Sequence, residues 1–219
     1  MFNNKSSICL WAMIPLLNVG FDSHDSSYLS QRDTEVLSLL EQEDLTAFTF
    51  DGLKRRLGLH QETLSRILAR LEEEGIIKKE ASGYRVTPRI ESMKLAPANV
   101  KEENVPLLQT YLPSNAQVQR LITNLRGKWF GLLRWFGLSE NEKGVALKWV
   151  TEDGGIQIDA VIADSVLTIE AKFLRENNLN TALSASYQLM GHISTLCSGS
   201  ASAKHVGFFG NTDVFLMPA

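Results

Sequence analysis

Cysteine is scarce in this sequence: Cys9 and Cys197 stand near opposite ends of the 219 residues. Two cysteines so far apart form neither a metal-ligand spacing nor a disulfide framework, which favours a reducing, intracellular compartment. An excess of one charge is also lacking, because 22 Lys and Arg stand against 25 Asp and Glu, a net charge of −3. Contact with nucleic acid must therefore depend on a local basic face. We expect a cytoplasmic protein.

A hydrophobic run long enough for a membrane is missing as well. Residues 8–17 (ICLWAMIPLL) are apolar but too short to span a bilayer, and they contain Pro15. No small-residue cleavage site follows, so a signal peptide is the lesser alternative. We expect residues 1–30 to be an apolar segment and linker that packs on another domain or a partner chain. We do not expect this protein to bind a membrane.

Motifs of common catalysts are absent too. The sequence has no glycine-rich phosphate loop, no nucleophile elbow and no metal-spaced cluster, and His192 and His205 are isolated. We therefore expect no metal, no cofactor and no enzymatic activity. The sequence does not identify a small-molecule effector.

What is present begins with three helical segments. Residues 31–42 and 50–57 have helical patterns, Thr49 is a suitable N-cap, and Gly58 is a helix stop. A third helix is predicted from about Gln61 to Glu74, and a hairpin over 76–87 turns around Ser82 and Gly83. Three helices and a hairpin are typical of a winged helix-turn-helix domain, here over residues 31–90.

The third helix has two distinct faces. At 100° per residue, Leu64, Ile67, Leu68 and Leu71 form one apolar stripe that must face a core. Glu62, Arg66, Ala69 and Glu73 point the opposite way, and Ser65 and Arg70 lie on the flanks. The exposed surface thus has side chains that suit a helix reading the major groove, namely Gln61, Ser65, Arg66 and Arg70. Phosphate contacts are expected from the second helix (Lys54, Arg55, Arg56) and from the hairpin (Lys78, Lys79, Tyr84, Arg85).

The stretch FDGLKRRLGLHQETLSRILARLEEEGIIKKEASGYRVT resembles the winged helix-turn-helix regulators of bacteria and archaea, the MarR/ArsR-like group, over about residues 31–88. The resemblance implies double-stranded DNA as partner, with Gln61, Ser65 and Arg66 facing the groove and Lys79 and Arg85 beside the wing. His60 departs from the usual Ser or Thr cap, and Glu62 places an acid in the first turn.

Winged helices also serve as protein-interaction modules. Residues 31–87 contain nine Lys and Arg against eleven Asp and Glu, a net charge of −2, which supports that alternative. The positive residues nevertheless gather on the second helix, the third helix and the hairpin, and this segregation favours DNA.

The second half predicts a different architecture. After a linker over 91–106, residues 107–219 are expected to form a small α+β domain with an antiparallel β-meander packed by helices. Residues 114–138 are predicted to be largely helical, although Gly127 and Gly131 interrupt them. Three strands (144–150, 155–163, 166–173), a helix (178–196) and a last hairpin (204–217) follow. The fold class is thus α+β, with a winged helix before a dimerisation or effector domain.

Tight turns in the meander place Lys148, Asp159 and Glu170 in one row, with Gln157 opposite Lys172. Asp159 with Glu170 and Lys172 is also the pattern of the PD-(D/E)xK nucleases, whose acids hold a divalent metal. A cross-strand lysine beside two acids is, however, typical of the solvent face of an ordinary meander, which we favour.

The run RGKWFGLLRWFGL mixes basic and aromatic residues, with Arg126, Lys128 and Arg134 among Trp129, Phe130, Trp135 and Phe136. It fits a nucleic-acid surface, but aromatics that cover a sheet or a dimer interface are the favoured interpretation. Together these patterns predict a homodimeric DNA-binding transcriptional regulator. The alternatives are a metal-dependent nuclease and a protein-interaction module.

Overall fold

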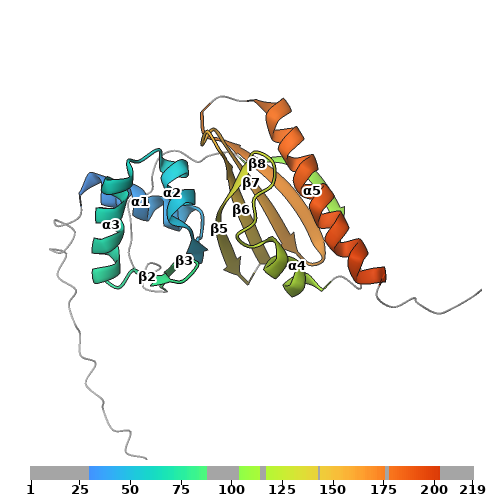
Figure 1. Cartoon of the computed structure of the whole chain (residues 1–219), viewed down its shortest axis with the longest axis horizontal. Coiled ribbons are helices and arrows are strands. Elements are labelled where there is room, and N and C mark those ends of the chain that lie inside the picture. Colours follow the sequence, from blue (N-terminus) through green and yellow to red (C-terminus); the bar gives the residue numbers. More distant parts are fainter. Residues whose placement is uncertain (1–29, 88–103, 114–116, 143, 176–177, 203–219) are drawn as a thin grey trace, which may run out of the picture.

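The computed structural model describes residues 30–87, 104–113, 117–142, 144–175 and 178–202. A helical domain lies beside a large sheet, and a long helix covers the far side of that sheet (Figure 1). The expected N-terminal segment over 1–29 and the expected hairpin over 204–217 lie outside the described residues. No described helix has both the length and the apolar character needed to cross a membrane.

The helical domain has the predicted three helices: α1 (Gln31–Gln42), α2 (Phe50–Leu57) and α3 (Gln61–Glu73). Local sequence sets their ends. Ser30 and Asp33 form a capping box at α1, the Thr49 hydroxyl caps α2, and Gly58 ends α2 with a φ of 63°. The hairpin of β2 (Ile77–Glu80) and β3 (Gly83–Val86) also lies where it was predicted.

The apolar stripe of α3 enters the core of this domain as expected. Leu64, Ile67, Leu68 and Leu71 are each at most 1% exposed. They pack with α1 and with Phe48 of β1 (Ala47–Phe48), a two-residue strand. Phe136 and Val150 of the second domain belong to the same cluster, so the two domains share part of one core.

The second domain contains an antiparallel meander of β5 (Leu133–Asn141), β6 (Gly144–Thr151), β7 (Ile156–Ala163) and β8 (Val166–Phe173). The predicted register is confirmed, because Asp159 pairs with both Lys148 and Glu170, and Gln157 pairs with Lys172. The predicted core face is buried under α5 (Leu179–Ser202), with Trp149, Ile158 and Ile169 each 0% exposed. Strand β4 (Val105–Tyr111) pairs with β8 and begins within the expected linker.

The helix expected over 114–138 is wrong beyond its first part. Only α4 (Val118–Leu125) is helical, and Leu133 to Asn141 form strand β5. Local aromatic and apolar residues suited either structure. Pairing with β6 along the whole strand and with β1 decided the outcome, and no local pattern reports such pairing.

One sheet joins the two domains, in the order β2-β3-β1-β5-β6-β7-β8-β4. The connection is β1, whose Ala47 and Phe48 pair with Leu138 and Gly137 of β5. The approach requires glycine, because a Cβ at Gly137 would lie 2.7 Å from the carbonyl oxygen of Ala47. The winged-helix domain is thereby held over the face of the meander that α5 leaves open.

Candidate nucleic-acid interface

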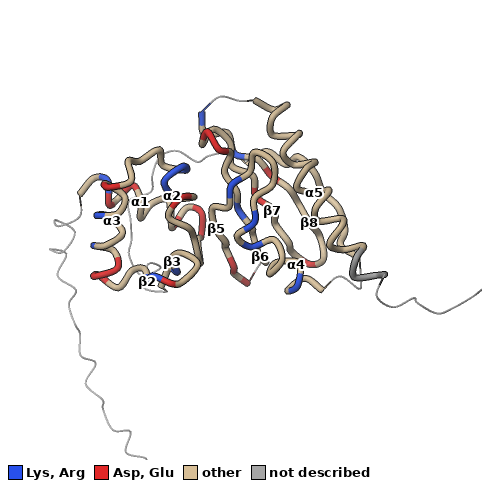
Figure 2. The backbone as a smooth tube through the Cα atoms, viewed as in Figure 1, with Lys and Arg blue, Asp and Glu red and all other residues tan. Residues whose placement is uncertain are grey.

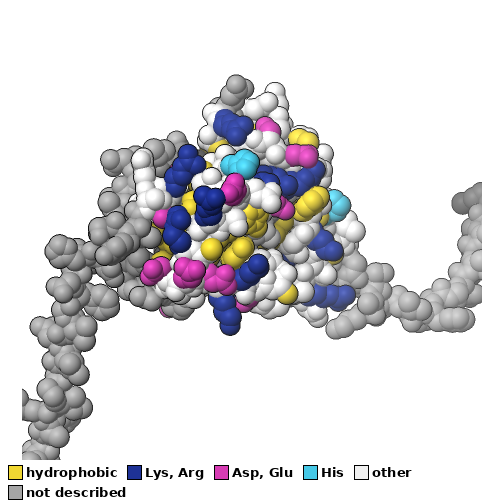
Figure 3. All heavy atoms as spheres, turned by 60° about the vertical axis from the view of Figure 1, so that its left-hand side comes forward, with side chains coloured by type: hydrophobic (Ala, Val, Ile, Leu, Met, Phe, Trp, Pro, Cys, Tyr) yellow, Lys and Arg dark blue, Asp and Glu magenta, His cyan; other side chains and the backbone are white. Residues whose placement is uncertain are grey.

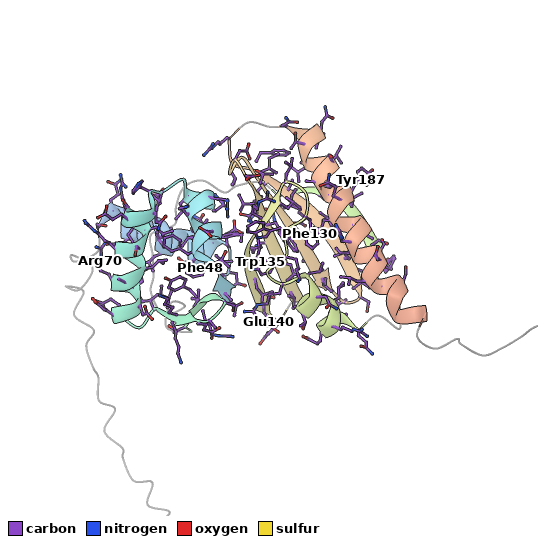
Figure 4. The ribbon with its side chains drawn as sticks, viewed as in Figure 1. Phe48, Arg70, Phe130, Trp135, Glu140 and Tyr187 are labelled. Carbon is purple, nitrogen blue, oxygen red and sulfur yellow. The ribbon has the colours of Figure 1, made fainter. Side chains whose placement is uncertain are left out.

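Helix α3 lies on the outer side of the helical domain, away from the large sheet (Figure 1). Gln61, Ser65, Arg66 and Arg70 are all exposed, as a groove-reading face requires. In Figure 4 the labelled Arg70 points outward, on the side opposite Trp135 of the second domain. The second domain therefore leaves this face of α3 open.

The two arginines on this face have different attachments. The Arg66 guanidinium pairs with Glu62 of the same helix at 2.5 Å, and its side chain is 72% exposed. The Arg70 guanidinium donates to Asp33 of α1 at 2.5 Å, and Asp33 is 1% exposed. Burial alone would raise the pKa of Asp33, but the hydrogen bonds from Arg70 and Ser30 outweigh it and lower that pKa. Among the described residues, Arg66 is thus attached only within its own helix, whereas Arg70 ties α3 to α1.

A shallow hollow of about 280 Å³ beside α3 adds a residue that the sequence analysis did not assign. Its walls include Arg66, Arg70 and also Arg32, an exposed residue in the first turn of α1. A positive charge there opposes the helix dipole, so the helix itself gains nothing from it. That unfavourable placement is the sequence signal that could have identified Arg32 as part of a basic surface.

The predicted phosphate contacts on α2 and the wing lie at the surface to different degrees. Lys79 and Arg85 are exposed, and Arg85 donates to Glu80 at 2.6 Å. Lys54 lies 3.8 Å from Asp51, and Arg55 is half-buried. Tyr84 stacks on Phe48 with ring centroids 5.4 Å apart, which leaves only part of this side chain for a ligand.

Acidic residues limit this interface at one end. Glu72, Glu73 and Glu74 are exposed around the C-terminal end of α3. Figure 3 shows basic side chains spread over this side of the molecule, above a row of acidic ones. The His60 cap is weak, as its departure from the usual residue indicated, since its ring nitrogen lies 3.4 Å from the Glu62 amide nitrogen. The C-terminal end of α3 is therefore acidic, and the exposed arginines of α3 lie before it.

Arg56 is not a phosphate contact, contrary to expectation. Its side chain is only 6% exposed, and it donates to Gln157 of β7 at 2.7 Å. The Arg56 side chain is buried because α2 packs against the meander and Arg56 lies on the packed side of this helix. Figure 2 shows acidic and basic positions on both sides of this domain boundary.

The meander face expected to be solvent-exposed is in fact buried. Lys148, Asp159, Gln157 and Lys172 are all at most 8% exposed. The winged-helix domain covers them and contributes Glu43, which follows α1 and is 3% exposed. We call Glu43, Arg56, Lys148, Gln157, Asp159 and Lys172 the interdomain charge cluster.

Glu43 is the centre of the interdomain charge cluster. Its carboxylate accepts hydrogen bonds from Lys172 at 2.6 Å and from Lys148 at 2.9 Å. Lys148 also donates to Asp159 at 3.0 Å, and the Gln157 amide donates to both Glu43 and Asp159 at 2.9 Å. Every buried side-chain nitrogen and oxygen among the described residues has a hydrogen-bond partner. Such complete pairing is what burial of charge requires.

Two pKa values reflect this geometry. Burial would raise the pKa of Glu43, but the charges of Lys148 and Lys172 and their hydrogen bonds outweigh burial and lower it to about 2. Burial would lower the pKa of Lys148, but Asp159 and Glu43 reverse that effect and raise it. Both groups are therefore held in their charged forms.

The three residues of the nuclease pattern are only partly brought together. The Lys172 ammonium lies 3.9 Å from Asp159, but Glu170 is outside the cluster and accepts a hydrogen bond from Asn104 at 2.8 Å. Asp159 is 3% exposed and already bound by Lys148 and Gln157, so a phosphodiester has no access to it. No group of three or more His, Cys, Asp or Glu in the described ranges could hold a metal ion.

The fold and the exposed α3 face together define a winged helix-turn-helix domain. Residues 29–83 match the model of the MarR family, so this part of the chain is similar to a MarR-type winged helix-turn-helix domain. The match ends at residue 83, so β5 to α5 lie outside it. Comparison with curated proteins and with solved structures finds no match.

Proposed function

We propose that this protein is a sequence-specific transcriptional regulator that inserts α3 into the major groove of double-stranded DNA. The observation that carries the proposal is the exposed polar face of α3, turned away from the second domain (Figure 1). Gln61 suits adenine, Arg66 suits guanine, and Ser65 can serve either base. Lys54, Arg55, Lys79 and Arg85 are assigned to phosphates, and Arg32 joins them from α1.

Glu62 has a specific place in this proposal. Its carboxylate accepts a hydrogen bond from the Arg66 guanidinium at 2.5 Å. An exposed pair on one helix contributes little stability, so a guanine edge can replace Glu62 at small cost. Glu62 itself can then accept a hydrogen bond from the N4 amino group of a cytosine.

Substitution of Arg66 by alanine is expected to weaken binding to the selected DNA site about tenfold to a hundredfold, as one lost bidentate base contact implies. The measurement is fluorescence anisotropy of a labelled duplex, first enriched by binding-site selection, at several salt concentrations. Lys79→Ala is expected to weaken specific and unspecific duplexes alike and to reduce the salt dependence by about one phosphate contact.

The matched control is Arg120→Ala, which removes an exposed arginine from α4 in the second domain. It is expected to leave affinity unchanged. Equal losses in Arg66→Ala and Arg120→Ala would contradict the assignment of α3. Absence of any binding at low salt would make this domain a protein-interaction module.

We further infer that the protein binds as a homodimer through its second domain, since two half-sites double the contacts of one winged helix. Two features support this: β4 is an edge strand of the sheet with Tyr111 81% exposed, and Tyr187 of α5 is 62% exposed. Sedimentation equilibrium is expected to show a dimer that Tyr187→Lys or Tyr111→Lys weakens about tenfold or more. A monomer that binds DNA one to one would contradict this inference.

A further inference from the structure

A groove of about 500 Å³ lies between the two domains and is lined by residues from both of them. Arg55 and Ser82 form the wall from the winged-helix domain, and Arg126 and Trp129 form the wall from the second domain. Gly127 also lines the groove, and a Cβ added there would meet no atom within 4 Å. The volume is within the range of small-molecule sites.

Trp129 stands out among the aromatic residues of this region. Its neighbours Phe130 and Trp135 are 7% and 6% exposed, whereas Trp129 is 62% exposed. In Figure 4 the labelled Phe130 and Trp135 lie within the body of the molecule, over the sheet. Trp129 therefore adds little to the core, and its exposure needs another explanation.

The Trp129 ring is nevertheless held in place. The Arg134 guanidinium lies over it, 4.9 Å from the ring centroid. Arg134 in turn donates to the Gly131 carbonyl oxygen at 2.7 Å and to Glu152 at 2.9 Å. The indole thus rests on a cation that is itself hydrogen-bonded, while 62% of Trp129 stays exposed, which suits a preorganised stacking platform.

Two cations face the same groove from opposite walls. Neither Arg55 nor Arg126 forms an ion pair with a carboxylate in the part of the chain that the structure describes. The one acid on the wall, Asp51, lies 3.8 Å from Lys54. Arg126 does lie within electrostatic range of Glu80, whose pKa is lowered mainly by Arg85 and also by Arg126. Two guanidinium groups across a groove are suited to phosphate oxygens, which arginine binds through paired N–H donors.

We propose that this groove is a nucleotide-binding site. The phosphate is bound by Arg126 and Arg55, and the base stacks on the exposed Trp129. A larger hollow of about 630 Å³ near Asp153 has one guanidinium, Arg175, but no aromatic residue among the described residues of its wall, and it also contains the acids Glu152 and Asp153. The combination of an aromatic platform and guanidinium groups selects a ligand that has both a ring and a phosphate.

A nucleotide bound here touches both domains, since Arg55 comes from α2 and Arg126 from the segment after α4. Arg55 is also assigned to a DNA phosphate, so the ligand competes with DNA for this side chain. We therefore expect the nucleotide to lower DNA affinity. That consequence rests on the proposed function, whereas the binding site itself does not.

The test is titration of the full chain with AMP, adenosine and inorganic phosphate. Binding is measured by calorimetry and by tryptophan fluorescence. AMP is expected to bind and to quench fluorescence, and to bind at least about tenfold more tightly than adenosine or phosphate, because each of these supplies one contact of the two. Arg126→Ala is expected to weaken AMP about tenfold or more without affecting adenosine. Trp129→Leu is expected to weaken AMP similarly and to abolish the quench.

Arg120→Ala is the matched control and is expected to bind AMP like the natural chain. Equal affinity for AMP and adenosine, or unchanged binding in Arg126→Ala, would overturn the proposal. If inorganic phosphate binds as tightly as AMP, the groove is only an anion-binding site. If an eight-residue oligothymidylate binds more than about tenfold more tightly than thymidine monophosphate, the groove is a channel for single-stranded nucleic acid instead.

The two proposals fail separately. Arg66→Ala is expected to lose duplex affinity and to keep AMP binding, while Trp129→Leu is expected to do the reverse. Loss of AMP binding alone would leave the regulator assignment intact. Absence of duplex binding in the natural chain, with AMP binding retained, would remove the regulatory consequence and keep the nucleotide site.

Discussion

Substitution of Lys148 by methionine is expected to lower the free energy of unfolding by about 3 to 5 kcal/mol, the usual cost of removing one partner from a buried ion pair. Lys148 bridges Glu43 and Asp159 with bonds of 2.9 and 3.0 Å, and its side chain is 6% exposed. Methionine fills a similar volume, so the lost free energy of unfolding comes from removal of the lysine charge and not from a cavity. Urea unfolding followed by circular dichroism measures it.

Lys128→Met is the matched control, because Lys128 is an exposed lysine on the same domain. It is expected to change stability by less than about 0.5 kcal/mol. The double variant Glu43→Gln with Lys148→Met is expected to cost less than the sum of the single ones, since the unpaired buried charge is removed as well. Additive losses would show that the two residues are not coupled, contrary to the geometry.

Stability is expected to fall in acid through Glu43. Its pKa of about 2 in the folded protein lies below its usual 4.5 in the unfolded chain. A carboxyl whose pKa is lowered by folding stabilises the folded state fully at any pH above its pKa in the unfolded chain. This stabilisation is lost as the pH falls from about 4.5 toward 2. By linkage the loss is roughly 3 kcal/mol. The measurement is the free energy of unfolding by urea at pH 6, 4.5, 3.5 and 2.5.

Glu43→Gln is the variant that isolates this effect. It cannot titrate, so the decrease in stability between pH 4.5 and 2.5 is expected to be smaller than in the natural chain. Asp33→Asn serves as a comparison, because Asp33 is another buried acid with a lowered pKa and lies outside the cluster. An equal pH dependence in Glu43→Gln and the natural chain would contradict the assignment to Glu43.

The cluster also bears on how the winged-helix domain is oriented. Glu43 and Arg56 come from the winged-helix domain, while Lys148, Gln157 and Lys172 come from the meander. Because all of these polar groups are satisfied only in one relative placement, the cluster favours a fixed orientation of the two domains. With β1 bonded to β5, it holds the two winged helices of a dimer at a defined separation if the dimer forms through the second domain.

Much of this protein was readable from the sequence by itself, because the relevant signals are local. Three helices with the Thr49 cap and the Gly58 stop followed from residues within one or two turns of each other. The exposed face of α3 followed from a period of 3.6, and the meander register followed from tight turns and a period of two. The MarR-like motif lies entirely within this local range.

The tertiary structure alone decided what depends on distant contacts. The Thr49 hydroxyl lies 3.2 Å from the Trp135 carbonyl oxygen, 86 residues away, and Glu43 meets Lys148 105 residues away. Such contacts turned an expected helix into β5, buried the charged face of the meander and buried the Arg56 side chain. A period in the sequence shows which residues share a face, but only packing between domains decides whether water or protein covers that face.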